Sequence, residues 1–449
     1  MLLRKPFLNP RQLIFIALAS LFSSTACYAS TLQTLSIYGS NTIGARLAPA
    51  LAEGFLQSQG FAYVHVQSNP ETLQHTITAG TDPLQLRVRI DIHAQGSSTG
   101  FSALHERSAN IAASSRPIKD QEVKLLNALG DMRNKHAEHV LAIDGLAIIV
   151  HNNSPVNALD ANQIAAIFSG EINDWSMLGA PPGPINIYAR DNNSGTWDTF
   201  KELILSPSDK TLSNNAKRFE SSEKLSDTVS KDPHGIGFIG LPYVRQAKAL
   251  AVSAGNAIAM QPSSDLIATE DYPLSRRLYL YSSEHEDNLL AQNLLAFAHS
   301  DAGQRLVESN GFISQIVSAM PVSVAEGMPQ RYQQLAREAQ RLSVNFRFKE
   351  GSSQLDNKAE RDIERVLAYL RKHNKTENKL VLVGFGDSKS DPQRALLLSK
   401  LRAMAVRRQL HNKEIIFREI FGIGDAMPVA NNLLDQGRIK NRRVELWVY

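Results

Sequence analysis

The stretch Ile185-Asn-Ile-Tyr-Ala-Arg-Asp-Asn-Asn-Ser-Gly-Thr196 is a short strand that runs into a Gly/Ser/Thr turn and then into a helix-like run. The same order of features occurs twice earlier, in Leu35-Ser-Ile-Tyr-Gly-Ser-Asn-Thr42 and in Ile90-Asp-Ile-His-Ala-Gln-Gly-Ser-Ser-Thr99. The helix-like runs that follow the turns are residues 43–56, 101–108 and 197–205. This alternation of strands and helices predicts an α/β fold.

The three turns also indicate a function. A helix N-terminus presents unpaired N–H groups and a partial positive charge, so anions bind there. Hydroxyl groups beside those N–H groups add neutral donors, and Arg190 adds a planar, charged one. Ordinary N-capping is the alternative, because Ser and Thr are preferred at that position anyway. Three such turns, one of them carrying Arg, favour a cage for one tetrahedral oxyanion.

The bulk composition describes a soluble globular protein with two or three domains. The chain has 449 residues, of which 43% are hydrophobic and 20% charged. Its net charge of +4 is uneven, because residues 341–449 hold 22 Lys and Arg against 13 Asp and Glu, and the remainder holds 26 against 31. Such a split favours two domains with different partners. The basic part either attracts anionic wall polymers or a membrane surface, or is a solvated basic face.

The N-terminus has the pattern of a secretory signal. Three basic residues precede an apolar stretch over residues 13–22 that is too short to span a bilayer comfortably. Small residues in Cys27-Tyr-Ala29 predict cleavage after Ala29, so residues 1–29 are the expected signal peptide. Lipoprotein processing at Cys27 is the alternative, although Ser24 stands where that signal prefers Leu. Cys27 is the only cysteine, so the mature chain would have no disulfide, Cys-based metal site or thiol nucleophile.

Two domains are expected after the signal. Residues 31–320 alternate strand-like and helix-like runs, the pattern of open sheets whose ligands bind beyond the carboxyl ends of the strands. Residues 321–342 are expected to form a partly helical linker, and residues 343–449 a compact α+β domain with two helices on one face of its sheet. The strands expected in that second domain are 343–348, 379–384, 415–421 and 443–449, and its helices are 357–373 and 393–411.

The first domain resembles the periplasmic phosphate-binding proteins of ABC transporters. The resemblance rests on Gly96-Ser-Ser-Thr-Gly100, Asn110-Ile-Ala-Ala-Ser-Ser-Arg-Pro-Ile118, Arg190-Asp-Asn-Asn-Ser-Gly-Thr196 and Tyr272-Pro-Leu-Ser-Arg-Arg-Leu-Tyr-Leu-Tyr281, and it covers roughly residues 35–318. It implies a hinge-closing α/β protein with two lobes, roughly 31–125 plus 255–320 and 135–250, and with the ligand between them. Carried over position by position, it implies that phosphate or a similar oxyanion is bound by Thr42, the Ile43 N–H, Ser98, Arg190, Ser194, Gly195 and Thr196.

One position departs from that family. The best-known transport members have an Asp after the serines of the segment that reads Ala113-Ser-Ser-Arg116 here. That Asp accepts a proton from hydrogen phosphate and repels a fully ionised oxyanion. Arg116 is either a second cation for a more highly charged anion or a residue that pairs with a neighbour such as Asp120. Phosphate is the first expectation, and another oxyanion stays open.

The second domain is similar to the OmpA-like peptidoglycan-binding domain. The signatures are Gly384-Phe-Gly-Asp387, Leu398-Ser-Lys-Leu-Arg-Ala403, Gly422-Ile-Gly-Asp-Ala-Met-Pro-Val-Ala-Asn431 and Gly437-Arg-Ile-Lys-Asn-Arg-Arg-Val-Glu445. The resemblance implies that Asp387 takes the ammonium and Arg402 the carboxylate of diaminopimelate in the wall peptide. Phe385, Gly386 and Ala395 replace polar residues of the family. The alternative for Asp387 and Arg402 is a structural ion pair.

A serine hydrolase is the enzyme alternative to these binding functions. Gly96-Ser-Ser98-Thr-Gly100 matches the G-x-S-x-G nucleophile elbow between a strand and a helix. A serine hydrolase also needs an acid and a His, and no pattern marks His151 or His234 for that role. The elbow explains one segment, whereas oxyanion binding explains four.

The sequence therefore predicts a non-enzymatic periplasmic protein that captures phosphate or a related oxyanion and is anchored to peptidoglycan, with outer-membrane association and an ABC permease partner left open. No cofactor or metal is expected, and nucleic acid is disfavoured by the export signal and the lack of an aromatic-basic motif. A structural or envelope-sensing protein whose cleft serves no transport is the alternative.

Overall fold

The computed structural model describes residues 32–69, 71–192, 194–255, 257–348, 355–387, 391–411, 413–433 and 435–449. The expected signal peptide and Cys27 lie outside these residues. Within the described ranges, no helix has the length and apolar character needed to cross a membrane.

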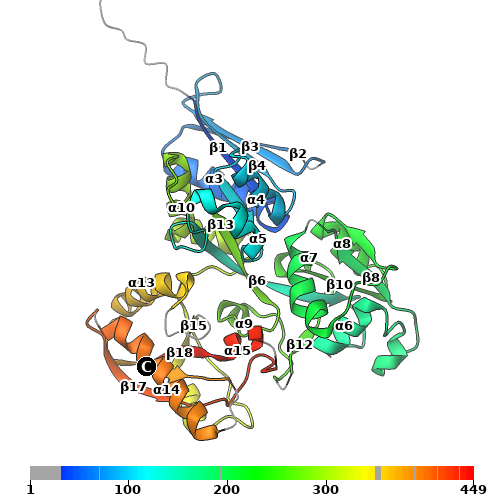
Figure 1. Cartoon of the computed structure of the whole chain (residues 1–449), viewed down its shortest axis with the longest axis vertical. Helices are drawn as coiled ribbons and strands as arrows, with labels where there is room; N and C mark the ends of the chain where they lie inside the picture. Colours follow the sequence, from blue (N-terminus) through cyan, green and yellow to red (C-terminus); the bar gives the residue numbers. More distant parts are fainter. Residues whose placement is uncertain are drawn as a thin grey trace, which may run out of the picture.

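The N-terminal part of the chain has two lobes that share one long strand (Figure 1). Its strands run in the order β2-β3-β4-β1-β5-β13-β6-β10-β8-β9, with β11 beside β6. The shared strand β6, Glu138–Val150, pairs with β13 in its first half and with β10 in its second half. It is buried from Val140 onward, which explains its continuous apolar sequence. The expected two-lobed α/β fold is confirmed.

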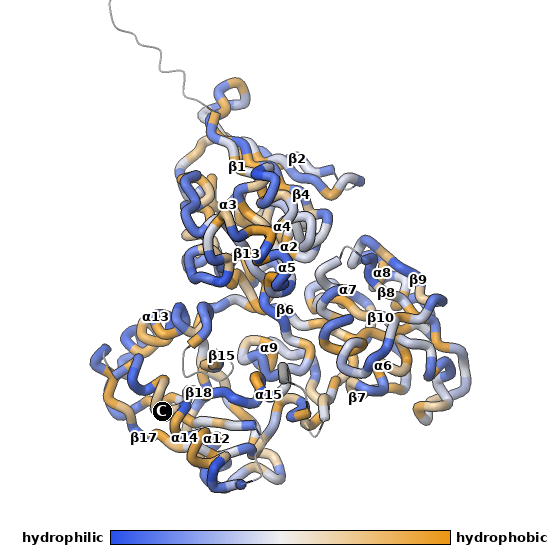
Figure 2. Tube along the Cα trace, in the orientation of Figure 1, coloured by the Kyte–Doolittle hydropathy of each residue, from blue (hydrophilic) through white to orange (hydrophobic). Residues whose placement is uncertain are grey.

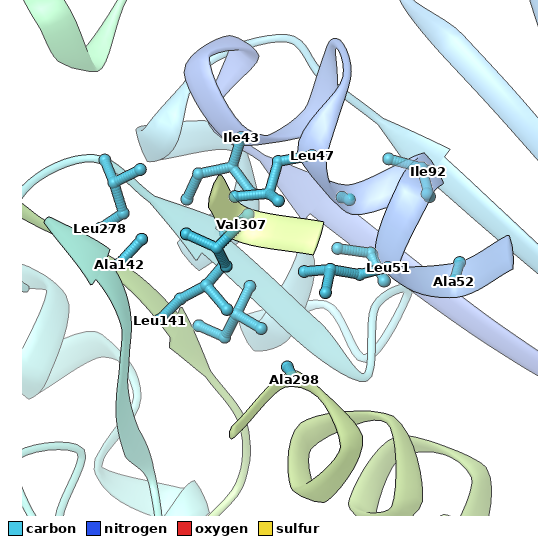
Figure 3. Packing of buried hydrophobic residues seen from close by; sticks show 14 of the residues in the cluster. Ile43, Leu47, Leu51, Ala52, Ile92, Leu141, Ala142, Leu278, Ala298 and Val307 are labelled. Carbon is cyan, nitrogen blue, oxygen red and sulfur yellow. The ribbon is translucent and has the colours of Figure 1, made fainter. Parts of the chain in front are cut away.

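The first lobe holds the strands β1 Gln33–Gly39, β2 Tyr63–Asn69, β3 Gln74–Gly80, β4 Leu86–His93, β5 Ile111–Ser114 and β13 Ser275–Tyr281. Its helices are α2 Asn41–Gly44, α3 Leu47–Ser58, α4 Ser97–His105, α5 Asp120–Leu125, α10 Leu289–His299 and α11 Asp301–Ser309. The run expected as one helix over 43–56 is divided into α2 and α3, because Arg46 leaves the helical conformation with φ −140°. Figure 3 shows Ile43 and Leu47 packed beside Val307 in the core, which fixes the first turn.

The second lobe holds β8 Asn186–Arg190, β9 Lys217–Phe219, β10 Gly235–Gly240 and β11 Lys248–Ala249, with the separate pair β7 Ala158–Asp160 and β12 Ala251–Ser253. Its helices are α6 Ala161–Ser169, α7 Gly195–Phe200 and α8 Ser222–Val229, and the short helix α9 Ser264–Ala268 follows on the way to β13. The helix expected over 197–205 is α7 followed by a π-helical turn, Lys201–Leu205.

The C-terminal domain is a five-stranded sheet in the order β14-β15-β18-β16-β17. The strands are β14 Ala319–Met320, β15 Gln340–Arg347, β16 Glu377–Gly384, β17 Ile416–Gly422 and β18 Arg443–Val448, and the helices are α12 Gln330–Glu338, α13 Asn357–Lys372, α14 Pro392–His411 and α15 Asp435–Asn441. Helices α13 and α14 share a core with one face of the sheet. Tyr332 and Leu335 of α12, in the stretch expected as a linker, pack with Val383 and Trp447 on the other face.

The C-terminal domain is docked on both lobes close to the shared strands (Figure 1). Arg341 of β15 donates to Asp271 at 2.7 Å, next to the start of β13. Arg277 of β13 donates to Asp356, the N-cap of α13, at 2.8 Å. On the side of the second lobe, Asn431 lies so close to Gly255 that a Cβ there would be 2.9 Å from its side chain.

Candidate functional site

The three strand–turn–helix segments meet between the two lobes. The Ser40 N–H donates to the Ala113 carbonyl at 2.8 Å, which places the first turn beside the end of β5. The hydroxyls of Thr42 and Thr196 lie 3.1 Å apart, although they come from different lobes. Gly195 approaches the second turn so closely that a Cβ would be 2.4 Å from the Ser97 Oγ. The turns therefore form one cluster, and the lobes touch across it.

N-capping accounts for only one of the three turns. The Ser194 hydroxyl accepts a hydrogen bond from the Thr196 N–H at 3.2 Å, so it caps α7 in the ordinary way. Helices α2 and α4 have no side-chain cap among the described residues. The Ile43 side chain is buried in the core, so its backbone N–H is the group that this residue presents at the uncapped turn.

Arg190 stands at the end of β8 with 1% of its surface exposed. Its guanidinium donates to the carbonyls of Phe219 and Glu220, at 3.1 and 2.6 Å, and to the Ser222 hydroxyl at 2.5 Å. A longer contact of 3.5 Å reaches the Asn41 Oδ1 in the other lobe.

All of these acceptors are neutral, and no Asp or Glu in the described ranges forms an ion pair with Arg190. Burial, with a smaller contribution from the charge of Arg276, lowers the pKa of Arg190 to about 10, against the opposing effects of Asp191 and Glu220. A buried cation that no carboxylate contacts is the expected environment for binding an anion.

Arg276 of β13 is a residue of this cluster that the sequence did not single out. It forms an ion pair with Asp144 at 2.6 Å, and both residues are buried. Its guanidinium also donates to the hydroxyls of Thr196 and Thr42, at 3.1 and 3.5 Å. Because these hydroxyl oxygens accept from Arg276, a hydroxyl hydrogen is left to donate to an anion. Arg276 therefore positions the two threonines.

The second turn presents Ser97 to the cluster, whereas Ser98 faces outward. Ser97 is fully buried, and its hydroxyl accepts from the Ser115 N–H at 3.2 Å. Ser98 is exposed, and its hydroxyl accepts from Arg116 at 3.1 Å. The two serines are adjacent in sequence, and they differ only in the direction in which the first turn of α4 points their side chains.

Arg116 is buried, and its charge is compensated by carboxylates. It donates to both oxygens of Glu122, at 2.7 and 2.8 Å, and to Asp198 of the other lobe at 2.9 Å. Desolvation opposes its charge, but these two carboxylates hold the pKa of Arg116 above its ordinary value. Asp120, the neighbour considered from the sequence, instead pairs with Arg133. Arg116 is thus a link between the lobes.

The hydrolase alternative finds no supporting geometry in the described residues. The hydroxyls of Ser97 and Ser98 make no hydrogen bond to a histidine there. His234 is hydrogen-bonded to Asp232 through its backbone and lies against Gly183, and His151 is bonded to the Asn153 N–H.

The second predicted site lies at the end of β16, where Asp387 is 1% exposed. Arg402 of α14 has its Nη2 3.8 Å from the Asp387 Oδ1, so the two residues do lie together. Arg442, to which the sequence assigned no role, donates to the Asp387 Oδ2 at 3.0 Å. Phe385 points into the core on the α12 side, where a polar side chain of the family was expected.

Comparisons with known proteins agree with both domains. The sequence profile of the PBP superfamily domain matches residues 71–302, and that of the OmpA family matches residues 347–442. The phosphate-binding protein PstS of Pseudomonas aeruginosa is 30% identical over 309 residues, which cover 64% of this chain and 92% of the relative. PstS of Borreliella burgdorferi is 27% identical over 230 residues, covering 50% of this chain and 79% of the relative.

One solved structure supports the same assignment. A phosphate ABC transporter substrate-binding protein from Clostridium perfringens, crystallised with bound phosphate, has a TM-score of 0.50 and 25% identity, over 63% of this chain and 99% of that chain. The resemblances inferred from the sequence are confirmed. This chain belongs to the PBP superfamily, within the family of the phosphate-binding protein PstS, and carries an OmpA-family domain at its C-terminal end.

Proposed function

We propose that this protein is a periplasmic binding protein, not an enzyme, that captures phosphate or a related oxyanion between its lobes. Arg190 carries the proposal, because its buried charge has only neutral acceptors around it. The proposed donors are Arg190, Gly195, Thr196, Thr42, the Ile43 N–H and Ser97, with Ser194 as the cap of α7. Ser97 takes the place of Ser98, and Arg116 holds the lobes together instead of contacting the ligand.

Thermal unfolding of the full chain with phosphate, arsenate and sulfate tests this function. Phosphate at a hundred times its Kd should add about 2.7 kcal/mol to the free energy of unfolding, because it binds only the folded state. Arg190→Gln should remove this stabilisation, and Arg305→Gln, at an exposed position on α11, is the matched control. A wild-type chain that none of the three anions stabilises would rule out the oxyanion function and leave the structural alternative.

We further propose that the C-terminal domain binds peptidoglycan through Asp387 and Arg402. A carboxylate beside a guanidinium matches the ammonium and carboxylate of a zwitterionic end such as that of diaminopimelate. Arg442 would hold the Asp387 carboxylate in place. An anchored binding protein is suited to sense or scavenge its anion at the wall, and delivery to an ABC permease is the transport variant of the same proposal.

Co-sedimentation of the full chain with purified peptidoglycan tests the anchor. Asp387→Ala should leave the protein in the supernatant, whereas Glu377→Ala, at an exposed position at the opposite end of β16, should sediment like the wild type. Equal sedimentation of all three chains would exclude Asp387 as the binding residue.

A further inference from the structure

Helix α14 of the C-terminal domain has an apolar face on each side. Its inner face packs toward the sheet through the buried residues Ala395, Ser399, Ala403, Val406 and Leu410. Its outer face carries a second stripe at helical spacing, formed by Arg394, Leu397, Leu401, Met404 and Arg408. One helix therefore presents large apolar side chains on the side opposite to its core contacts.

The outer stripe lies open to solvent in the described structure. Leu397 and Leu401 are 58% and 54% exposed, and the neighbouring Leu396 is 51% exposed. Helix α14 packs mainly on β16, β17, β18 and α13 of its own domain. It lies at the outer edge of that domain, away from the two lobes, as Figures 1 and 2 show. Neighbouring exposed leucines on one helix indicate an interaction surface for another macromolecule or a membrane.

The charges around the stripe specify an anionic partner. Helix α14 contains five Lys and Arg and no Asp or Glu. Arg394, Lys400 and Arg408 are exposed and form no ion pair with any residue in the described ranges. The acidic residues that line the neighbouring hollow on α13 are paired: Glu364 with Lys413 at 3.2 Å, and Glu360 with Lys135 at 3.6 Å. Asp391, just before the first turn of α14, accepts from the Gln393 N–H.

A hollow extends the apolar surface between α13 and α14. It has a volume of about 780 Å³, and Leu401, Met404 and Ile363 line its apolar part. Its charged lining is mixed, with Arg408 and Lys413 beside Glu360 and Glu364. The hollow thus continues the apolar stripe and is large enough to take up aliphatic chain.

We propose that the outer face of α14 binds the surface of an anionic phospholipid bilayer. An apolar stripe flanked by Lys and Arg is the pattern of helices that lie in a membrane interface, with the leucines entering the acyl region and the cations meeting the headgroups. A second copy of this chain fits less well, because a two-fold contact through the stripe would bring Arg394, Lys400 and Arg408 of each copy together with no acidic residue between them.

Vesicle co-sedimentation of the full chain tests the proposal. The wild type should sediment with vesicles of phosphatidylethanolamine and phosphatidylglycerol, should be released by salt, and should stay in solution with phosphatidylcholine alone. The pair Leu397→Ser with Leu401→Ser should abolish sedimentation. The pair Arg394→Gln with Arg408→Gln should lower the partition coefficient roughly tenfold or more, since each cation near an anionic surface contributes severalfold.

Leu84→Ser is the matched control, because Leu84 is 95% exposed on the first lobe and should not affect vesicle binding. All substituted side chains are exposed, so the thermal transition should remain that of the wild type. A wild type that ignores anionic vesicles would overturn the proposal, as would equal binding by the leucine variant. Concentration-dependent dimers that the leucine variant loses, without vesicle binding, would overturn it in favour of self-association.

Discussion

Arg190 and Arg116 are both 1% exposed where the two lobes meet, yet their surroundings differ. Arg190 is surrounded by neutral oxygens, and burial lowers its pKa to about 10. Arg116 is held by Glu122 and Asp198, and its pKa is raised although desolvation opposes the charge. In the proposed function a bound anion supplies the counter-charge in the first case, whereas the second charge is already neutralised.

Arg116→Gln should therefore destabilise the chain more than it weakens anion binding. We expect a loss of about 1–3 kcal/mol in the free energy of unfolding, since Glu122 and Asp198 lose their shared cation but are partly exposed. Phosphate affinity in calorimetric titration should fall only severalfold, whereas Arg190→Gln should lower it at least a hundredfold. Equal losses in the two variants would make Arg116 an anion ligand.

The residue scale also marks the limit of what the sequence could provide. The three turns and the proximity of Asp387 to Arg402 followed from motifs that are local in sequence. Ser97 and Ser98 differ only in the direction in which α4 presents them. Arg276 and Arg277 are adjacent in one strand, and the structure alone shows that the first contacts Thr196 and the second Asp356. Partners such as Asp198, 82 positions from Arg116, leave no local signal.

At the scale of elements, α13 is attached to the first lobe through two histidines. Arg361 donates to the Nδ1 of His139 and pairs with the Nε2 of His299, each at 2.9 Å. Burial lowers the pKa of His139 to about 4, and burial with the charges of Arg361 and Arg365 holds the pKa of His299 well below its ordinary value. The backbone carbonyl of Lys135 also accepts a hydrogen bond from Arg361, and the charge of His136 adds to the lowering of the His139 pKa. The negative charges of Glu138 and Asp362 favour the charged form of Arg361.

The sign of the resulting pH dependence follows from these lowered pKa values. Well above pH 6.5 both histidines are neutral whether folded or unfolded, and the contact is at full strength. As the pH falls from about 6.5 towards 4, the unfolded chain takes up protons that the folded contact excludes, so stability decreases. Urea unfolding at pH 7.5 and 5 should show a loss of about 1–2 kcal/mol per histidine.

The variant His139→Gln with His299→Gln should flatten this dependence, and the exposed His105→Gln should leave it unchanged. Identical pH profiles for the wild type and the double variant would place the dependence elsewhere in the chain.

Secondary structure was the more predictable part at this scale, because period and turn signals are local. The expected strand 379–384 and helix 393–411 correspond to β16 and α14. The stretch expected as a linker was harder to place, because α12 acquires its partners only when Val383 and Trp447 come together in the sheet. The sequence shows the periodic apolar positions of α12, but it does not show that residues of β16 and β18 cover them.

At the scale of the whole molecule, docking on both lobes links the C-terminal domain to the cleft. If the lobes close around an anion as proposed, their relative position changes, and with it the contact at Arg277–Asp356, the contact at Asn431–Gly255, or both. Occupancy of the cleft and docking of the domain are then coupled, and coupling of this kind is reciprocal.

Asp356→Asn isolates this coupling, because Asn can still cap α13 but loses the ion pair with Arg277. We expect the Kd for phosphate to change two- to fivefold in this variant. In the wild type, the Kd for a soluble wall peptide should differ between phosphate-free and phosphate-saturated protein, and Asp356→Asn should change that difference by the same factor. Asp265→Asn, at an exposed position on α9, is the control. Unchanged phosphate affinity in Asp356→Asn would show that the domain is attached without communication.

The position of the Arg341–Asp271 contact has a mechanical consequence. This buried ion pair joins the C-terminal sheet to the segment that leads directly into β13, the strand that carries Arg276. If the C-terminal domain is held by a stretched polymer network, tension on that domain acts on the pivot of the two lobes and not on a slack tether. Tension on the C-terminal domain would then shift the equilibrium between open and closed arrangements of the two lobes.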